Sequence, residues 1–298
     1  MKPLAAVLTV QVALGLVLIA LVATDNVPFL DGDSDAAPRA AGPSVDRFDS
    51  AAAFRLLREQ VELGPRPAGS PASRRLAARL RRLLPNGRFQ AIPRHPGLRN
   101  VVGRVRGRSR RYVVVGAHYD TKDIPGFVGA NDGASGTATV VQLARELRGR
   151  RPPKTLVFVL FDGEESPGPD DDGDFLRTGL RGSKFAARRY REAEAMVLLD
   201  FVGDKNLRIP REDLSNRRLW ARLRAASRRV GASRVFPSSS SDAVYDDHVP
   251  FLRRGVPSID LIDFDFPCWH RRCDNMSAVS ERSLDRVGET VYELLASL

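Results

Sequence analysis

Residues 112–120 read YVVVGAHYD, a continuous apolar run that ends in a histidine and an aspartate. Later runs have the same apolar character: TLVFVLF at 155–161, MVLLDF at 196–201 and VPSIDLI at 256–262. Strands that are apolar without alternation are typical of a parallel sheet that is covered on both faces. The remaining sequence predicts the covering helices, at 134–147, 183–190, 215–230 and 280–298. This alternation of strands and helices predicts an α/β fold.

Two further helices are predicted before the first of these strands. Apolar residues recur at helical spacing between Phe54 and Val61, and Gly64 follows as a stop. Ser70 and Pro71 form the serine–proline pair that is typical of a helix start. No repeat or internal boundary is visible after residue 46. We therefore predict one α/β domain over 46–298, with a mainly parallel mixed sheet flanked by helices.

The first 23 residues predict a membrane segment. Residues 4–23 are almost entirely apolar and would span about 30 Å as a helix, the thickness of a bilayer core. Lys2 precedes this run and Asp25 follows it, an order that places the rest of the chain outside the cytoplasm. The alternative is a signal peptide cleaved after Ala23, which also exports the domain. Residues 24–45 are rich in Asp, Ala, Pro and Gly and are predicted to be a linker.

The net charge is concentrated in one part of the chain. The 298 residues carry a formal charge of +11, and residues 51–112 contain 16 arginines and two glutamates. Such a balance would suit a nucleic-acid partner. The arginines lie between apolar helix positions, however, as on the solvated faces of amphipathic helices. We therefore expect no nucleic-acid partner. The 43% of hydrophobic residues excludes a largely disordered chain.

Histidines and carboxylates follow the predicted strands, where open α/β sheets bind ligands. These residues are His118 and Asp120, Glu164 and Glu165, Asp200, and His270, with Asp132 ahead of the first covering helix. Imidazole and carboxylate groups together are typical ligands of a zinc ion that keeps an open position for catalysis. Adjacent glutamates cannot face one metal in the same way, so one can bind the metal while its neighbour moves protons. The sequence therefore predicts a zinc enzyme.

Six segments in order resemble the zinc aminopeptidase and glutaminyl cyclase superfamily. They are AHYDT (117–121), FVGANDGASG (127–136), FDGEE (161–165), LLDFVG (198–203), DDHVPFLRRGVP (246–257) and WH (269–270). The stretch LGPRPAGSPAS (63–73) is similar to the start of that domain. The resemblance covers about 46–298 and implies a zinc exopeptidase-like fold. It also implies that the substrates are the amino ends of peptides and proteins.

The resemblance implies two alternative metal centres. In a glutaminyl cyclase, one zinc would be held by Asp132, Glu165 and His270. Glu164 would shuttle a proton, and Asp200 and Asp246 would form a supporting hydrogen-bond network. In an aminopeptidase there would be two zinc ions and Glu164 would be the base. Its metal ligands would be His118 and Asp200 for one ion, Glu165 and His270 for the other, and Asp132 as the bridge.

We favour the cyclase, which converts an N-terminal glutamine to pyroglutamate. The doubled acid Asp246–Asp247 and the GSKFAAR segment at 182–188 are similar to cyclases, whereas NDGASG at 131–136 is similar to the peptidases. The aminopeptidase therefore remains the alternative. An aromatic pocket formed by Phe266 and Trp269 would suit a small substrate side chain. The run FPCWH is one residue shorter than the animal cyclase pattern, which leaves the role of Phe266 open.

Cys268 and Cys273 flank His270 in the sequence. Outside the cytoplasm they could pair and fix the loop that carries this predicted ligand. Free thiols and a separate metal site are the alternatives.

Overall fold

The computed structural model describes residues 43–168 and 174–298. The apolar segment predicted at 1–23 and all but the last three residues of the linker predicted at 24–45 lie outside the described residues. Within the described ranges, no helix has both the length and the apolar character that crossing a membrane requires. The described residues belong to one unit.

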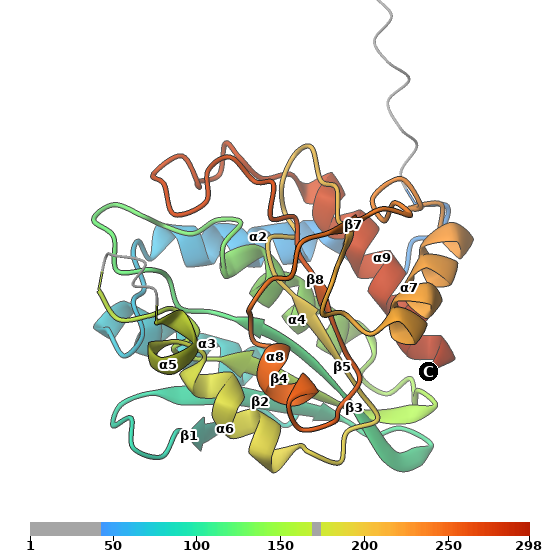
Figure 1. Cartoon of the computed structure of the whole chain (residues 1–298), viewed down its shortest axis with the longest axis horizontal. Coiled ribbons are helices and arrows are strands. Elements are labelled where there is room, and N and C mark those ends of the chain that lie inside the picture. Colours follow the sequence, from blue (N-terminus) through green and yellow to red (C-terminus); the bar gives the residue numbers. More distant parts are fainter. Residues whose placement is uncertain (1–42, 169–173) are drawn as a thin grey trace, which may run out of the picture. The chain divides into compact units, whose positions relative to one another are not determined.

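A six-stranded mixed sheet forms the centre of this unit (Figure 1). In spatial order its strands are β1 (Arg88–Ala91), β2 (Arg99–Val105), β4 (Lys154–Phe161), β3 (Ser109–His118), β5 (Ala195–Leu199) and β8 (Ser258–Leu261). Strands β4, β3, β5 and β8 pair in parallel, whereas β1 and β2 add antiparallel pairs at one edge. The predicted α/β fold with a mainly parallel mixed sheet is confirmed, and the four apolar runs are its parallel strands.

The two faces of the sheet carry separate apolar cores, because successive side chains of a strand point to opposite faces. On β4, Leu156, Phe158 and Leu160 belong to the larger core, and the residues between them belong to the smaller one. The larger core is covered by α2 (Ser50–Glu62), α3 (Pro71–Leu83), α4 (Ala134–Glu146), α7 (Arg217–Arg229) and α9 (Glu281–Ser297). The smaller core is covered by α6 (Arg181–Arg189) and α8 (Val249–Leu252).

Helix α4 lies closest to the sheet and brings its first turn to the site described below. Eleven of its residues, Ala134 to Ala144, are buried. A Cβ added at Gly136 would lie 2.0 Å from the carbonyl oxygen of Leu199 in β5, so only glycine permits this approach. The start of α3 also follows its sequence signal: Ser70 Oγ accepts a hydrogen bond from the backbone N–H of Ser73 at 3.0 Å, with Pro71 in the first turn.

Several short elements were not predicted from the sequence. They are the antiparallel strands β1 and β2, the helix α5 (Phe175–Thr178), and the two-stranded pair β6 (Arg211–Glu212) and β7 (Ser240–Ser241).

Candidate metal centre

The carboxyl ends of the parallel strands bring the predicted ligands together. His118 is the last residue of β3, Glu164 and Glu165 follow β4, and Asp200 follows β5. Asp132 lies just before α4, and His270 lies in the long segment after β8. All of these side chains except that of His270 are buried. Residues that are far apart in the chain therefore meet at one edge of the sheet, as the sequence predicted.

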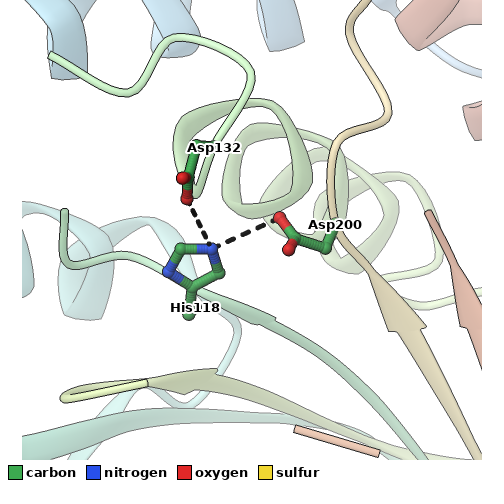
Figure 2. A group of neighbouring side chains, drawn as sticks. All are labelled: His118, Asp132 and Asp200. Carbon is green, nitrogen blue, oxygen red and sulfur yellow. Dashed lines mark hydrogen bonds and ion pairs between the residues drawn. The ribbon is translucent and has the colours of Figure 1, made fainter. Parts of the chain in front are cut away.

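Two groups of possible metal ligands share Asp132. In the first group, His118 Nε2 lies 3.2 Å from Asp132 Oδ1 and 3.3 Å from Asp200 Oδ1 (Figure 2). In the second group, His270 Nε2 lies 3.3 Å from Glu165 Oε1 and 3.6 Å from Asp132 Oδ2. Asp132 thus offers one oxygen to each group, which is how a carboxylate bridges two metal ions.

The electrostatics of the centre fit a bound cation. Burial and repulsion by Asp132 raise the pKa of Glu165 to about 6, and burial raises the pKa of Asp200 to about 7. Burial lowers the pKa of His118, but Asp200, Asp120 and Asp132 outweigh burial and raise it well above its usual value. The positively charged side chains nearby are therefore too few to balance the negative charge of these buried carboxylates, and a bound cation would supply the rest. Nitrogen and oxygen donors in these groups suit zinc.

Glu164 is buried and is a member of neither group; its Oε2 lies 4.0 Å from His118 Nδ1, and it is next to Glu165 in the chain. Burial and repulsion by Glu165 raise the pKa of its carboxyl group well above the usual value, and Asp246 and Asp247 repel it further. A carboxyl group with a raised pKa holds a proton more readily than an ordinary carboxyl group, which suits a group that accepts and returns a proton. This environment suits the proton-moving role that the sequence predicted for Glu164.

Two buried aspartates hold the loops that carry the ligands. Asp274 accepts the backbone N–H of Asn131 at 2.7 Å with one carboxylate oxygen and that of Asp132 at 3.1 Å with the other. Asp120 likewise accepts the backbone N–H of Glu164 at 3.2 Å with one carboxylate oxygen and that of Glu165 at 3.3 Å with the other. Sequence analysis had placed Asp120 at the rim and had not singled out Asp274. The position of Asp274, four residues after a predicted ligand, was the available signal.

A fully buried arginine, Arg66, also holds the loop that carries Asp132. The Arg66 guanidinium donates hydrogen bonds to the backbone oxygens of Gly64, Val128 and Gly129, and to that of Gln60, at 2.8–3.2 Å. Burial lowers the pKa of Arg66 to about 10, and nearby carboxylates including Asp132 oppose that effect. Sequence analysis did not single out Arg66. Arg66 differs from the exposed arginines in its burial and its four backbone acceptors, which the sequence alone does not show.

The ligands open into a pocket of about 510 Å³ with aromatic walls. Trp269 stacks on His270 with ring centroids 4.7 Å apart and lies 5.2 Å from Phe264. Phe201 and Tyr245 also line the pocket. Its acidic residues are Asp132, Glu164, Glu165, Asp200, Asp242, Asp246 and Asp265.

Phe266 lies behind this wall. It is buried, is not among the residues that line the pocket, and packs against Phe201 with ring centroids 5.9 Å apart. Phe264, two residues earlier, faces the pocket and is 45% exposed. The sequence analysis did not identify Phe264.

His248 lies apart from both metal groups. It is fully buried, with Nε2 3.4 Å from Glu212 Oε1 and Nδ1 3.7 Å from Asp260 Oδ2. The carboxyl groups of Asp260 and Asp246 are close enough to shift each other's pKa. The acidic DDH segment is thus connected to a second buried charge cluster behind the pocket.

Cys268 and Cys273 form a disulfide, with their Cα atoms 5.4 Å apart. The residues between the two cysteines, 269–272, include Trp269 and His270, and His270 has a positive φ of 51°. Left-handed backbone is unfavourable for a residue other than glycine, so it needs support from its surroundings. The disulfide closes the loop around this residue.

Comparisons with known proteins identify related chains. The model of the family described as "Peptidase family M28" matches residues 100–295. The glutaminyl-peptide cyclotransferase of Bothrops jararaca is 30% identical over 238 residues, covering 64% of this chain and 62% of that protein. The chain therefore spans less than two thirds of the length of this relative.

Among solved structures, a leucine aminopeptidase precursor from Bacteroides thetaiotaomicron matches with a TM-score of 0.76 and 25% identity, covering 86% of this chain and 99% of that one. An Acidobacteriales bacterium glutaminyl cyclase matches with a TM-score of 0.72 and 30% identity, covering 86% and 96%.

Proposed function

The chain belongs to peptidase family M28, and we propose that within this family it is a zinc-dependent glutaminyl-peptide cyclotransferase. The reaction would convert the N-terminal glutamine of a peptide or protein to pyroglutamate and release ammonia. The observation that carries the proposal is that the buried Glu164 lines the same pocket with aromatic walls as the group Asp132, Glu165 and His270. The similarity to named cyclotransferases and cyclases supports it.

One zinc ion would be held by Asp132, Glu165 and His270, and when bound it would polarise the γ-carbonyl of the glutamine. Glu164 accepts a proton from the α-amino nitrogen as this nitrogen attacks the γ-carbon and forms the ring C–N bond. Glu164 then returns the proton to the γ-amide nitrogen. The bond between that nitrogen and the γ-carbon breaks, and ammonia leaves. Asp200 and Asp246 line the same pocket and supply the supporting hydrogen-bond network.

The aromatic wall would orient the substrate. Trp269 and Phe264 present adjacent rings at the pocket, and Trp269 is held against His270. A flat glutamine side chain can pack against such rings while its amide faces the metal ligands. In this proposal Phe266 supports the wall from behind through Phe201, whereas Trp269 and Phe264 contact the substrate.

The second candidate is an aminopeptidase with two zinc ions, and the group His118, Asp132 and Asp200 favours it. With both groups filled, Asp132 would bridge the ions and Glu164 would take a proton from the attacking water. The substrate would again be the amino end of a peptide, but the products would be a free amino acid and a shortened peptide.

Product analysis distinguishes the two functions. The full chain, loaded with zinc, is incubated separately with Gln-Ala and Leu-Ala. Pyroglutamyl-Ala and ammonia from the first, with intact Leu-Ala, are expected for the cyclase. Free leucine would support the aminopeptidase, and turnover of neither dipeptide would overturn both proposals. Elemental analysis adds a second measurement: about one zinc per chain is expected for the cyclase and about two for the aminopeptidase.

Glu164→Gln tests the role of the proton carrier. Positioned acid–base groups contribute about 10²–10⁴-fold to rate, so we expect a loss of that size in kcat with the zinc content retained. The matched control is Glu62→Gln, an exposed glutamate at the end of α2, which should keep wild-type activity. A Glu164→Gln variant with full activity would contradict this assignment.

We also propose that the catalytic domain works outside the cytoplasm, anchored by residues 4–23 or released after residue 23. The Cys268–Cys273 disulfide supports this location, because disulfides persist mainly in oxidising compartments. If the domain is anchored, a protease added to intact cells that express the chain should degrade it. If the domain is released, it should be present in the medium. Complete protection of a cell-associated domain would contradict export.

A further inference from the structure

Six arginines gather at the end of the sheet opposite the metal centre. The metal ligands follow the carboxyl ends of the parallel strands, whereas these arginines lie at the amino ends of β3 and β4 (Figure 1). Strand β3 has ten residues, so the two regions are about 30 Å apart. The arginine cradle, as we name it, consists of Arg104, Arg106, Arg108, Arg110, Arg148 and Arg151.

Within the described residues, no acidic side chain neutralises the arginine cradle. All six residues are exposed. None of their guanidinium groups forms an ion pair or hydrogen bond with another residue in the ranges 43–168 and 174–298, although other arginines such as Arg111 and Arg229 do. Six like charges at close range repel one another, so an anion that bridges them would be stabilised.

The arginine cradle is concave. It lines two adjoining pockets of about 480 and 530 Å³, which share Asn86, Arg104, Arg106 and Arg151. The residues that line these two pockets include no aspartate or glutamate. The six arginines therefore line one shared space, which distinguishes them from arginines spread along a helix face.

A rigid backbone frame carries the arginine cradle. The turn between β2 and β3 is joined to the segment before β4 by hydrogen bonds from Arg108 N to Pro152 O at 2.8 Å and from Ser109 N to Pro153 O at 3.0 Å. A Cβ on Gly107 would lie 2.2 Å from the carbonyl carbon of Lys154, so the two segments are in direct backbone contact. Arg151 has a positive φ of 47°, a costly conformation that surrounding structure must maintain. A fixed frame lowers the entropy lost when a ligand is bound.

We propose that the arginine cradle binds a ligand with several closely spaced phosphate groups. Guanidinium groups bind phosphate oxygens through paired, charge-assisted hydrogen bonds, and several arginines at fixed spacing match several phosphates. The paired pockets have room for more than one phosphate group. The ligand is either a soluble oligophosphate or the headgroup layer of an anionic phospholipid surface, which present the same chemistry.

The remaining surface favours recognition by charge alone. In the part of the chain that the structure describes, the exposed large hydrophobic residues are Tyr245, Phe264 and Trp269, and all three line the catalytic pocket. The arginine cradle thus has no exposed aromatic ring on which a nucleobase could stack, which single-stranded nucleic acids commonly require. It also has no exposed large apolar side chain to insert among lipid chains.

Calorimetric titration of the full chain with tripolyphosphate tests the proposal. The cradle variant combines Arg106→Gln and Arg151→Gln. The control variant combines Arg75→Gln and Arg82→Gln on the exposed face of α3, which removes the same charge at residues that have no partner among the described parts of the chain. We expect saturable binding at 50 mM salt that weakens at least tenfold in the cradle variant and less than twofold in the control. Both variants should keep wild-type dipeptide turnover, because the metal centre is remote.

Two further arms identify the source of the phosphate groups. Co-sedimentation with phosphatidylglycerol vesicles, compared with phosphatidylcholine vesicles, should depend on the arginine cradle if the ligand is a lipid headgroup. Binding of tripolyphosphate, together with vesicle co-sedimentation that does not depend on the arginine cradle, would indicate a soluble ligand. Equal weakening in the cradle and control variants would overturn the proposal, as would no binding of either probe by the wild-type chain. Tighter, cradle-dependent binding of a 20-base-pair DNA duplex would instead assign the surface to nucleic acid.

Discussion

Replacing Asp274 with asparagine should weaken metal binding without removing any metal ligand. Asp274 uses both carboxylate oxygens, one for the backbone N–H of Asn131 and the other for that of Asp132. Asparagine has the same shape but only one of its two terminal atoms can accept a hydrogen bond. One of the two N–H groups therefore loses its acceptor in a fully buried place.

The size of the effect follows from these two hydrogen bonds. A buried donor left without an acceptor costs about 1–3 kcal/mol in folding free energy. This cost destabilises the loop that positions Asp132, the residue shared by the two groups. Part of this cost is relieved when the loop moves and Asp132 leaves its place between the two metal groups. We therefore expect zinc affinity to fall about 10–100-fold, the range typical for residues that orient metal ligands.

Competition with a chromophoric zinc chelator measures this affinity directly. The matched control is Asp263→Asn, because Asp263 is also buried but accepts one backbone N–H, that of Arg208, with one oxygen. Asparagine can keep that single bond, so the control should bind zinc within twofold of the wild type. Wild-type zinc affinity in Asp274→Asn, together with a lowered melting temperature, would refute the positioning argument and leave Asp274 with a purely structural role.

Three other predictions concern the loop, the packing and the charge of the domain. Replacing Cys268 and Cys273 by serine should lower zinc affinity and kcat more than stability, because the freed loop carries His270; unchanged zinc affinity by chelator competition would contradict this. Gly136→Ala should cost more than about 3 kcal/mol in denaturant unfolding, because backbone must move where α4 meets β5; a loss under 1 kcal/mol would show that the helix adjusts easily. Burial and repulsion by Glu289 raise the pKa of Asp285 to about 6, so the folded state gains stability from its protonation at low pH and loses that gain as pH rises through 6. Asp285→Asn should therefore stabilise the zinc-free protein by about 1 kcal/mol at pH 7, after allowance for partial exposure, and by nothing at pH 4; equal effects at both pH values would exclude the titration.

The parallel part of the sheet was predictable because its strands are buried on both faces. The runs at 112–117 and 155–161 are apolar at every position or nearly so, and no surface requirement interrupts them. Strand β2 escaped prediction because it has a different environment: exposed Arg104 and buried Gly103 interrupt its apolar residues. Strand β1 has four residues and none is fully buried, so its place depends on pairing with β2 rather than on its own pattern.

The meeting of the candidate metal ligands at one edge was predictable for a related reason. Parallel strands end at one edge, so side chains that follow them meet wherever loops are short. The aromatic wall was less accessible to sequence reasoning, because Phe264 and Phe266 both lie in an irregular segment after β8. Which ring faces the pocket depends on the path of that segment. That path is set by the disulfide and by contacts with Phe201, neither of which has a local pattern.

The aspartates of this centre have different roles because their oxygens meet different partners. Those of Asp132 and Asp200 face imidazole nitrogens across gaps that a metal ion would fill, and Asp200 Oδ1 also accepts the backbone N–H of Phe201 at 2.9 Å. Those of Asp120 and Asp274 meet consecutive backbone N–H groups, which already satisfy part of their charge. Residue type is the same in all four, and each lies near a predicted ligand in the sequence. A candidate ligand can therefore be distinguished from a loop-holding residue only after the partners of both carboxylate oxygens have been located: Asp120 and Asp274 each use both oxygens for backbone N–H groups, whereas Asp200 uses one. For this reason a count of acidic residues overestimates the number of metal ligands, and the two groups joined by Asp132 are the arrangement that metal analysis must test.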